Sequence, residues 1–293
     1  MELRVLRYLL AVAREENVSR AAESLHVTQP TLSRQLIELE EEFGFKLFIR
    51  GGRKITMTEE GVLLRKRAEE IIDLVYKTEN ELRAPDGNIN GDIFIGGGET
   101  DGMRIVAQMA DSLQKDYPDI RFNLFSGNAE EVTARLDKGL IDFGILVGFT
   151  EMTKYESLRL PASDTWGVLM RKDSPLASYR TIKPEDLWDL PLISSRQTMA
   201  SSEIPRWMKR DYEQLRIVAT YNLIYNASLM VEEGMGYALS LDKLVNTAGD
   251  SALCFRPLDP PLKADIYIVW KRHQIFSKAS GIFLERIHQI FGA

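Results

Sequence analysis

Hydrophobic residues near the N-terminus recur at helical spacing in two stretches that flank a short alanine-containing segment. In the first stretch the apolar positions fall at i, i+3, i+7 and i+10, on one face of a helix: Leu3, Leu6, Leu10 and Ala13. In the second stretch the apolar positions repeat at i, i+4, i+7 and i+11: Leu32, Leu36, Leu39 and Phe43. Between them, RAAESL predicts a short helix with Ser19 as its N-cap. The pattern therefore predicts three helices around one small apolar core.

The third of these helices begins with polar residues. Thr28 is its predicted N-cap and Gly44 its end, and Pro30 is tolerated in the first turn. The outward positions of its first turns can read base edges or hold phosphates: Gln29, Pro30, Thr31, Ser33 and Arg34. The helix ends in four acidic residues that a phosphate backbone would repel: Glu38, Glu40, Glu41 and Glu42. Only the first turns are therefore expected to enter a DNA groove.

The alternative is an ordinary three-helix bundle whose polar face is solvated. The next segment, FKLFIRGGRKITMT, favours DNA binding, because two apolar runs flank a GG turn and predict a hairpin. This hairpin would carry the cations Arg50, Arg53 and Lys54. A cationic hairpin beside a polar-faced helix is suited to holding the phosphate backbone.

The segment from Leu3 to about Ile72 closely resembles the N-terminal winged helix-turn-helix of LysR-type transcriptional regulators. Matching residues occur in the family's order: Ala21, Ala22, Val27, Thr28, Gln29, Pro30, Ser33, Arg34, Gln35, Leu39, Glu40, Gly44, Leu47, Phe48, Arg50, Thr58 and Gly61. The chain departs from the family's frequent Gly-Ser before the paired alanines, where it has Asn17, Val18 and Ser19. The residues and the resemblance together give a candidate DNA-binding set: Ser19, Thr28, Gln29, Pro30, Thr31, Ser33, Arg34, Arg50, Arg53 and Lys54.

A long helix is predicted after the hairpin, because no proline interrupts TEEGVLLRKRAEEIIDLVYKTENELR. Thr58 is its predicted cap, and Glu59 and Glu60 suit the positive end of the helix dipole. The helix either packs on its own domain or, as the resemblance implies, pairs with its twin in a second subunit. The short linker APDGNING favours pairing. We therefore expect a homodimer, and the family implies a homotetramer.

Beyond Gly91 the sequence alternates between strand and helix patterns, which indicates a parallel sheet flanked by helices. This half resembles the two-lobed α/β effector domain of the same family, which is Rossmann-like and similar to type II periplasmic binding proteins. We therefore expect a multidomain protein in which an all-α winged helix-turn-helix and a long linker helix precede this α/β domain. The expected bounds are 1–58 for the DNA-binding domain, 59–90 for the linker helix and hinge, and 91–293 for the effector domain. Lobe I would comprise 91–162 and 268–293, and lobe II 163–267.

The loop GGGETDG fits neither GxGxxG nor a P-loop, so a nucleotide site has weak support. The resemblance instead implies a cleft lined by strand ends and helix starts: Glu99, Thr100, Asp101, Ser126, Gly127, Asn128, Val147, Gly148, Phe149, Ser194, Ser195, Arg196, Gln197, Tyr225 and Asn226. Such groups suit a small polar or anionic ligand, with Arg196 as a candidate carboxylate partner. Glu99 would either attract an amino group, which would indicate a zwitterion, or cap the helix that follows it.

Composition narrows the class of protein. With 44% hydrophobic and 27% charged residues, and with arginines interrupting the first apolar run, the chain is expected to be soluble and cytoplasmic. The net charge of -6 argues against indiscriminate coating of nucleic acid. The single cysteine, Cys254, excludes an internal disulfide, and the three histidines have no metal-site spacing. We expect no metal and no cofactor.

These features predict a DNA-binding transcriptional regulator, and not an enzyme, whose promoter binding is modulated by a small effector. Its expected partners are double-stranded promoter DNA, the effector and further copies of itself, with RNA polymerase as a further candidate and no membrane. The competing class is an enzyme or transport-type binding protein built on the α/β half. Against it, the sequence has no GxSxG motif, no placed Cys/His pair and no signal peptide.

Overall fold

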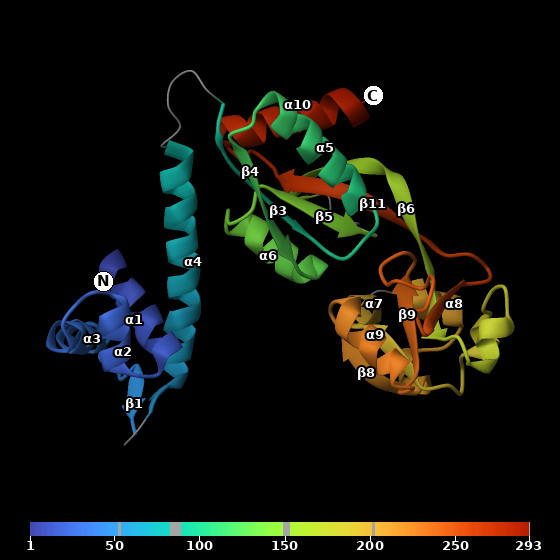
Figure 1. Ribbon diagram of the computed structural model, residues 1–293, viewed down its shortest axis with the longest axis horizontal. Helices are drawn as coiled ribbons and strands as arrows, with labels where there is room; N and C mark the ends of the chain where they lie inside the picture. The colour runs from blue at the N-terminus through green and yellow to red at the C-terminus, as the bar shows by residue number, and fades with distance from the viewer. Residues whose placement is uncertain (52–53, 83–88, 149–152, 201–202, 293) are drawn as a thin grey trace. The chain divides into compact units, whose positions relative to one another are not determined.

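The structure, a computed structural model, describes residues 1–51, 54–82, 89–148, 153–200 and 203–292. Its contacts divide the chain into two compact units, Met1–Arg83 and Ala84–Ala293 (Figure 1). The expected fold class is confirmed, because a helical unit with a small hairpin precedes an α/β unit with two lobes.

The first unit packs three short helices against the start of a long one. The helices are α1 (Leu3–Glu15), α2 (Val18–Ser24), α3 (Gln29–Phe43) and α4 (Glu59–Leu82). Between α3 and α4, β1 (Phe48–Arg50) pairs with β2 (Ile55–Met57) in antiparallel fashion, with Phe48 opposite Met57. The predicted three helices, hairpin and long helix are therefore all present.

Side-chain caps set the helix starts, with one difference from the prediction. The Thr28 hydroxyl accepts from the Thr31 amide at 3.4 Å, and the Thr58 hydroxyl accepts from the Gly61 amide at 2.9 Å. The predicted cap of the second helix is wrong. Asn17 has the extended backbone of an N-cap and accepts from the Arg20 amide at 3.1 Å, which places Ser19 inside α2.

The apolar face predicted for the first helix is only partly correct, since Leu6 is buried in the core but its predicted neighbours on that face are not. Leu3 is 44% exposed, and Leu10 and Ala13 are only half-buried. The buried side chains of α1 instead lie on a broader surface: Val5, Leu6, Tyr8, Leu9, Ala11 and Val12. The reason is that α1 contacts α2, α3 and α4 at once, so a single stripe does not describe its buried surface. Phe43, predicted in the core, is 37% exposed and stacks on Phe45.

Lobe I of the second unit is a mixed sheet covered on both faces. Its strands are β3 (Gly91–Gly97), β4 (Ile120–Ser126), β5 (Phe143–Val147), the first part of β6 (Tyr155–Arg171) and β11 (Lys263–Lys271), in the order β4-β3-β5-β11-β6. Strands β3, β4 and β5 are parallel, and β11 is antiparallel to both neighbours. Helices α5 (Met103–Asp116) and α10 (Lys278–Phe291) cover one face, and α6 (Ala129–Asp137) covers the other (Figure 1).

Lobe II is built on the second half of β6. Strand β9 (Tyr237–Leu241) pairs with one edge of β6 and β10 (Leu253–Pro257) with the other. Strand β7 (Leu192–Ser195) joins β9, and β8 (Ile217–Tyr221) joins β7, both in parallel. The helices are α7 (Arg196–Ala200), α8 (Glu203–Met208) and α9 (Ile224–Glu232), with 3₁₀ turns at Pro175–Ser178, Pro184–Asp186 and Tyr212–Gln214.

Two strands connect the lobes. Strand β6 runs from lobe I into lobe II without interruption, and the chain returns through β11, whose Lys263 lies opposite Thr165 and whose Lys271 lies opposite Tyr155. Residues far apart in sequence are therefore held together where the lobes meet.

Candidate functional site

The turn between α2 and α3 brings the two helices into close contact. Ala21 and Ala22 are buried, and the Val27 amide donates to the Ala22 carbonyl at 3.0 Å. His26 takes a positive φ of 54°, a conformation that reverses the chain within a few residues. Small side chains at the contact and a tight turn therefore fix α3 against α2.

The first turns of α3 form an exposed polar surface. Thr28, Gln29, Pro30, Thr31 and Arg34 are exposed, and Ser33 is half-buried. The Gln29 amide nitrogen donates to the Ser33 hydroxyl at 2.8 Å, and the Arg34 guanidinium pairs with Glu38 at 2.8 Å. Because the Arg34–Glu38 pair is exposed, its net stabilisation is small, and Arg34 can exchange Glu38 for another acceptor at little cost.

The remaining residues of the candidate DNA-binding set lie around this surface. Ser19 is exposed on α2, and Lys54 precedes β2 and pairs with Glu16 at 2.7 Å. The Lys54 hydrogen bond and charge lower the pKa of Glu16. Arg50 ends β1, but its side chain and the whole of Arg53 lie outside the described residues.

Glu40, predicted to point away with the other acids of the helix end, has a structural role that the sequence did not reveal. The Glu40 side chain is 9% exposed and accepts from the Leu47 amide at 2.9 Å, while Lys46 pairs with it at 2.7 Å. It thereby ties the end of α3 to the start of the hairpin. In the sequence, only the closeness of Glu40 to Lys46 and Leu47 hints at this structural role. The neighbouring acids of the helix end are exposed, so residue type alone does not distinguish Glu40 from them.

The ionisation of Glu40 links the stability of this unit to pH. Burial alone would raise the pKa of Glu40, but Lys46 and the amides of Leu47 and Phe48 outweigh it and hold that pKa below its ordinary value of 4.5. The carboxylate therefore stabilises the fold above about pH 4.5, and this contribution is lost as pH falls through the lower folded pKa. We expect Glu40→Gln to cost about 1 kcal/mol of unfolding free energy at neutral pH.

The measurement is denaturant unfolding of wild type and Glu40→Gln from about pH 7 down to about pH 3. The difference between the two proteins should shrink as pH falls, since the wild-type side chain becomes neutral as well. A difference that stays constant over this range would contradict the assignment.

A cavity of about 540 Å³ lies between the lobes of the second unit. Six residues of the predicted effector set line it: Glu99, Asn128, Val147, Gly148, Ser195 and Gln197. Thr100, Asp101 and Ser126 line a neighbouring cavity of about 520 Å³ instead, which Glu99 shares. The cavity volume is within the usual range for small-molecule sites.

Other predicted effector residues do not line either cavity. Arg196, Tyr225 and Asn226 are exposed outside them, Gly127 and Ser194 are buried, and Phe149 lies outside the described residues. Arg196 is therefore not placed to pair with a ligand carboxylate in the larger cavity. Lining residues that the sequence did not suggest come mainly from lobe II: Trp166, Thr198, Glu203, Arg206, Tyr221 and Asn222.

Two side chains that line the 540 Å³ cavity, Glu99 and Gln197, bond to the opposite lobe. Glu99, in the loop after β3, accepts from the Ile224 amide at the start of α9. Gln197 accepts from the Ala129 amide at 3.3 Å and donates to the Val147 carbonyl at 3.5 Å. Of the two roles considered for Glu99, capping does occur, but the capped helix is α9 in the other lobe and not α5, which follows in sequence.

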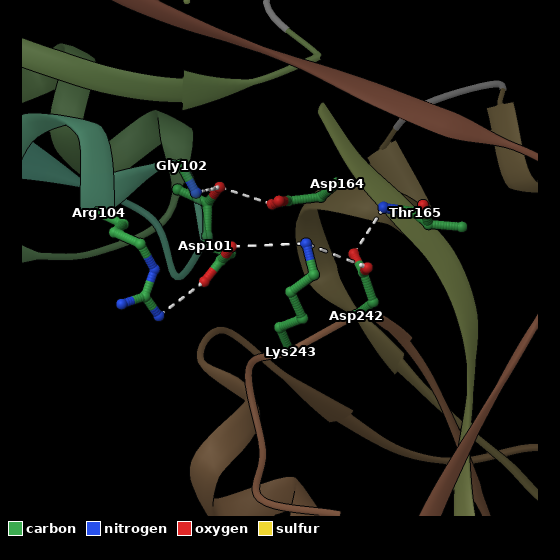
Figure 2. Close-up of polar contacts among 8 residues, drawn as sticks. Asp101, Gly102, Arg104, Asp164, Thr165, Asp242 and Lys243 are labelled. Atoms are coloured by element: carbon green, nitrogen blue, oxygen red, sulfur yellow. Dashed lines mark hydrogen bonds and ion pairs between the residues drawn. The ribbon is translucent and has the colours of Figure 1, made fainter. Parts of the chain in front are cut away.

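A polar network accompanies the junction of the lobes (Figure 2). Lys243 of lobe II contacts Asp101 of lobe I at 3.5 Å and Asp242 at 3.7 Å. The Thr100 hydroxyl donates to Asp164 on β6 at 2.6 Å. Burial, with the charges of Asp242 and Asp101, raises the pKa of Asp164, although the Thr100 bond opposes the shift. The loop after β3, strand β6 and lobe II are thus joined by polar contacts at one point.

Two structural findings bear on other classes of function. Within the described ranges, no set of three or more His, Cys, Asp or Glu side chains is arranged to hold a metal ion. No helix in those ranges is long and apolar enough to cross a bilayer.

Two family models match the chain. The one described as "LysR substrate binding domain" matches residues 86–291, and the one described as "Bacterial regulatory helix-turn-helix protein, lysR family" matches residues 3–62. A "Probable RuBisCO transcriptional regulator" of Synechocystis sp. is 29% identical over 290 residues, covering 96% of this chain and 84% of that protein. The "Uncharacterized HTH-type transcriptional regulator YvbU" of Bacillus subtilis is 28% identical over 295 residues and covers 100% of both chains.

Solved structures share the fold. CbnR, described as "a LysR family transcriptional regulator", aligns with a TM-score of 0.76 at 19% identity, covering 99% of each chain. Full-length CbnR "complexed with the target DNA complex" aligns with a TM-score of 0.73 at 20% identity, again over 99% of each chain.

Proposed function

Because this chain belongs to the LysR family of bacterial transcriptional regulators, we propose that it reads promoter DNA with the first turns of α3. The observation that carries the proposal is the exposed polar surface at the start of α3, where Gln29, Thr31 and Arg34 project from a helix fixed against α2. Glutamine and arginine can form bidentate hydrogen bonds with base edges, and threonine can bond phosphates. The acidic residues at the other end of α3 favour entry by the first turns alone.

The functional form is a homodimer held together through α4. Ala68, Leu64 and Ile71 of α4 pack on the first unit's own core, as one of the two alternatives expected. The helix nevertheless leaves large apolar side chains exposed: Val62, Leu63, Leu74, Tyr76 and Leu82. A second α4 would cover them, and two-fold symmetry would present two α3 helices to sites about one turn of DNA apart. A tetramer would follow from further contacts between dimers.

The second unit supplies the regulatory input. A small polar effector in the 540 Å³ cavity would touch both lobes, since Glu99 and Asn128 belong to lobe I and Gln197 to lobe II. An effector alters promoter binding only if its affinity differs between two states of the protein. The contacts of Glu99, Gln197 and Lys243 across the cleft are bonds that such a ligand would change.

Arg34→Ala tests the DNA-reading surface. We expect it to weaken selective binding to DNA upstream of the protein's own gene by about 1–3 kcal/mol, because a side chain that contacts a base edge is lost. The measurement is footprinting and titration of the full-length protein at a stated salt concentration. Wild type should protect a two-fold symmetric site, and Arg34→Ala should bind that site more weakly.

Arg65→Ala is the matched control. Arg65 pairs with Glu69 at 3.0 Å across one turn of α4, as Arg34 pairs with Glu38 on α3, and both arginines are largely exposed. Removing Arg65 takes away the same charge and the same kind of ion pair. Equal losses in the two variants would mean that Arg34 acts only through general charge, and the proposed reading surface would be rejected.

A further inference from the structure

We propose that the ligand of the cleft carries a protonated amine that pairs with Glu99, an inference that rests on the proposed effector role of this cavity. The cavity lies between the lobes and is lined by groups of both. Its charged residues, and the way in which its helix N-termini are already occupied, select the class of ligand.

Two helix N-termini at the cavity, those of α9 and α6, are already occupied by the protein's own acceptors. Helix N-termini attract anions through their free amides. At α9 the Ile224 amide donates to Glu99, and at α6 the Ala129 amide donates to Gln197 at 3.3 Å. The Asn128 amide donates to Glu131 at 2.8 Å within a capping box. A ligand carboxylate would have to displace one of these acceptors before it could bind at the start of α9 or α6.

The charges of the lining also favour a cation. Glu99 and Glu203 contribute two carboxylates, and Arg206 contributes one cation. Glu99 is half-buried beside the cavity, yet in the described part of the chain no lysine, arginine or histidine pairs with it. The Ile224 amide satisfies one carboxylate oxygen of Glu99, and a ligand ammonium would supply the full opposite charge that the amide does not.

The Glu99 carboxylate affects the ionisation of a side chain in the cavity wall. Burial raises the pKa of Tyr221, a lining residue, and the nearby Glu99 carboxylate raises it further, although a bond with Ser240 opposes the shift. Trp166 also lines the cavity. Aromatic rings attract ammonium groups, so these walls are compatible with a cation.

Arg206 could pair with a second, negatively charged group of the ligand. It is exposed on α8 and, within the described residues, makes no ion pair or hydrogen bond through its side chain. It is the only positive charge of the described lining. A ligand with both an amine and a carboxylate would therefore satisfy the charges of the cavity better than a simple anion.

The test compares three probes that share a three-carbon skeleton: propylamine, propionate and β-alanine. Binding to the full-length protein is measured by calorimetric titration at matched ionic strength, for wild type and Glu99→Gln. The glutamine oxygen can still accept from the Ile224 amide, so the variant removes the charge and keeps the cap. Glu213→Gln, at an exposed position away from the cavity, is the control.

We expect propylamine and β-alanine to bind wild type more tightly than propionate does. Glu99→Gln should weaken both amines about tenfold, since a charged hydrogen bond is replaced by a neutral one, and Glu213→Gln should leave them unchanged. Tighter binding of propionate than of propylamine, or amine binding that survives Glu99→Gln, would overturn the inference while leaving an effector site in place. If no probe binds, the amine inference fails, and footprinting still decides the DNA-reading role separately.

Discussion

Replacing Gly61 with alanine is expected to destabilise the first unit by about 3 kcal/mol. Gly61 is the third residue of α4, and a Cβ added there would lie 2.2 Å from the Leu47 carbonyl oxygen. That oxygen already accepts from the Thr58 amide at 3.0 Å, so it cannot move without breaking the bond that joins the hairpin to α4. The contacted atom belongs to the backbone of Leu47, so a change of side-chain rotamer cannot relieve the clash.

Gly281→Ala is the matched control, because Gly281 also lies in a helix, α10, but has open space where its Cβ would be. There alanine should stabilise the protein by up to about 1 kcal/mol through its better helix propensity. Denaturant unfolding of both variants, followed by circular dichroism, provides the comparison. A Gly61→Ala protein as stable as wild type would show that the contact with Leu47 is looser than 2.2 Å implies.

Asp142→Ala is expected to destabilise lobe I by about 3 kcal/mol or more. Asp142 is 2% exposed and accepts from the Phe94 amide at 2.9 Å and the Ser280 hydroxyl at 3.0 Å. It thereby joins β3 to α10 across the start of β5. Alanine would leave the Phe94 amide, the Ser280 hydroxyl and the Gln274 side-chain amide without this acceptor. Each buried donor left without an acceptor costs about 1–3 kcal/mol.

The control for Asp142 is Asp116→Ala. Asp116 pairs with Arg286 at 2.6 Å and also links two elements of lobe I, α5 and α10, but its side chain is 55% exposed. An exposed pair contributes about 0–1 kcal/mol, so this variant should unfold near the wild-type midpoint. Thermal unfolding of the two variants separates the effects, and equal shifts in melting temperature would contradict the buried role of Asp142.

Local patterns predicted the first unit well, because its structure depends on neighbouring residues. Thr28 and Gly44 mark the ends of α3 in both sequence and structure, and the two apolar runs of the predicted hairpin pair as β1 and β2. The errors came from tertiary packing. Leu3 has the right spacing for a buried face, but α1 is surrounded by three helices and buries other positions. The sequence pattern predicts the cap of α2 at Ser19, whereas the structure places it at Asn17.

The cleft was harder to predict, since its walls come from segments that only the fold brings together. Strand ends of lobe I were identified through the resemblance, and Glu99 and Asn128 do line the cavity. Residues of lobe II such as Glu203 and Arg206 lie on a six-residue helix with no motif of its own. Nothing in the local sequence around Ile224 indicates that its amide would meet a carboxylate more than a hundred residues away.

The position of β11 has a consequence for how the protein is made. This strand, close to the C-terminus, lies between β5 and β6 in the sheet of lobe I, and α10 then covers that sheet. During translation, all the strands of lobe II are therefore synthesised before β11, the strand that completes lobe I. Until then β5 and β6 are edges without their shared partner, and such edges are prone to pair with other chains. Lobe II, although it comes later in the sequence, needs only the first residues of β11 for its core and can finish folding first.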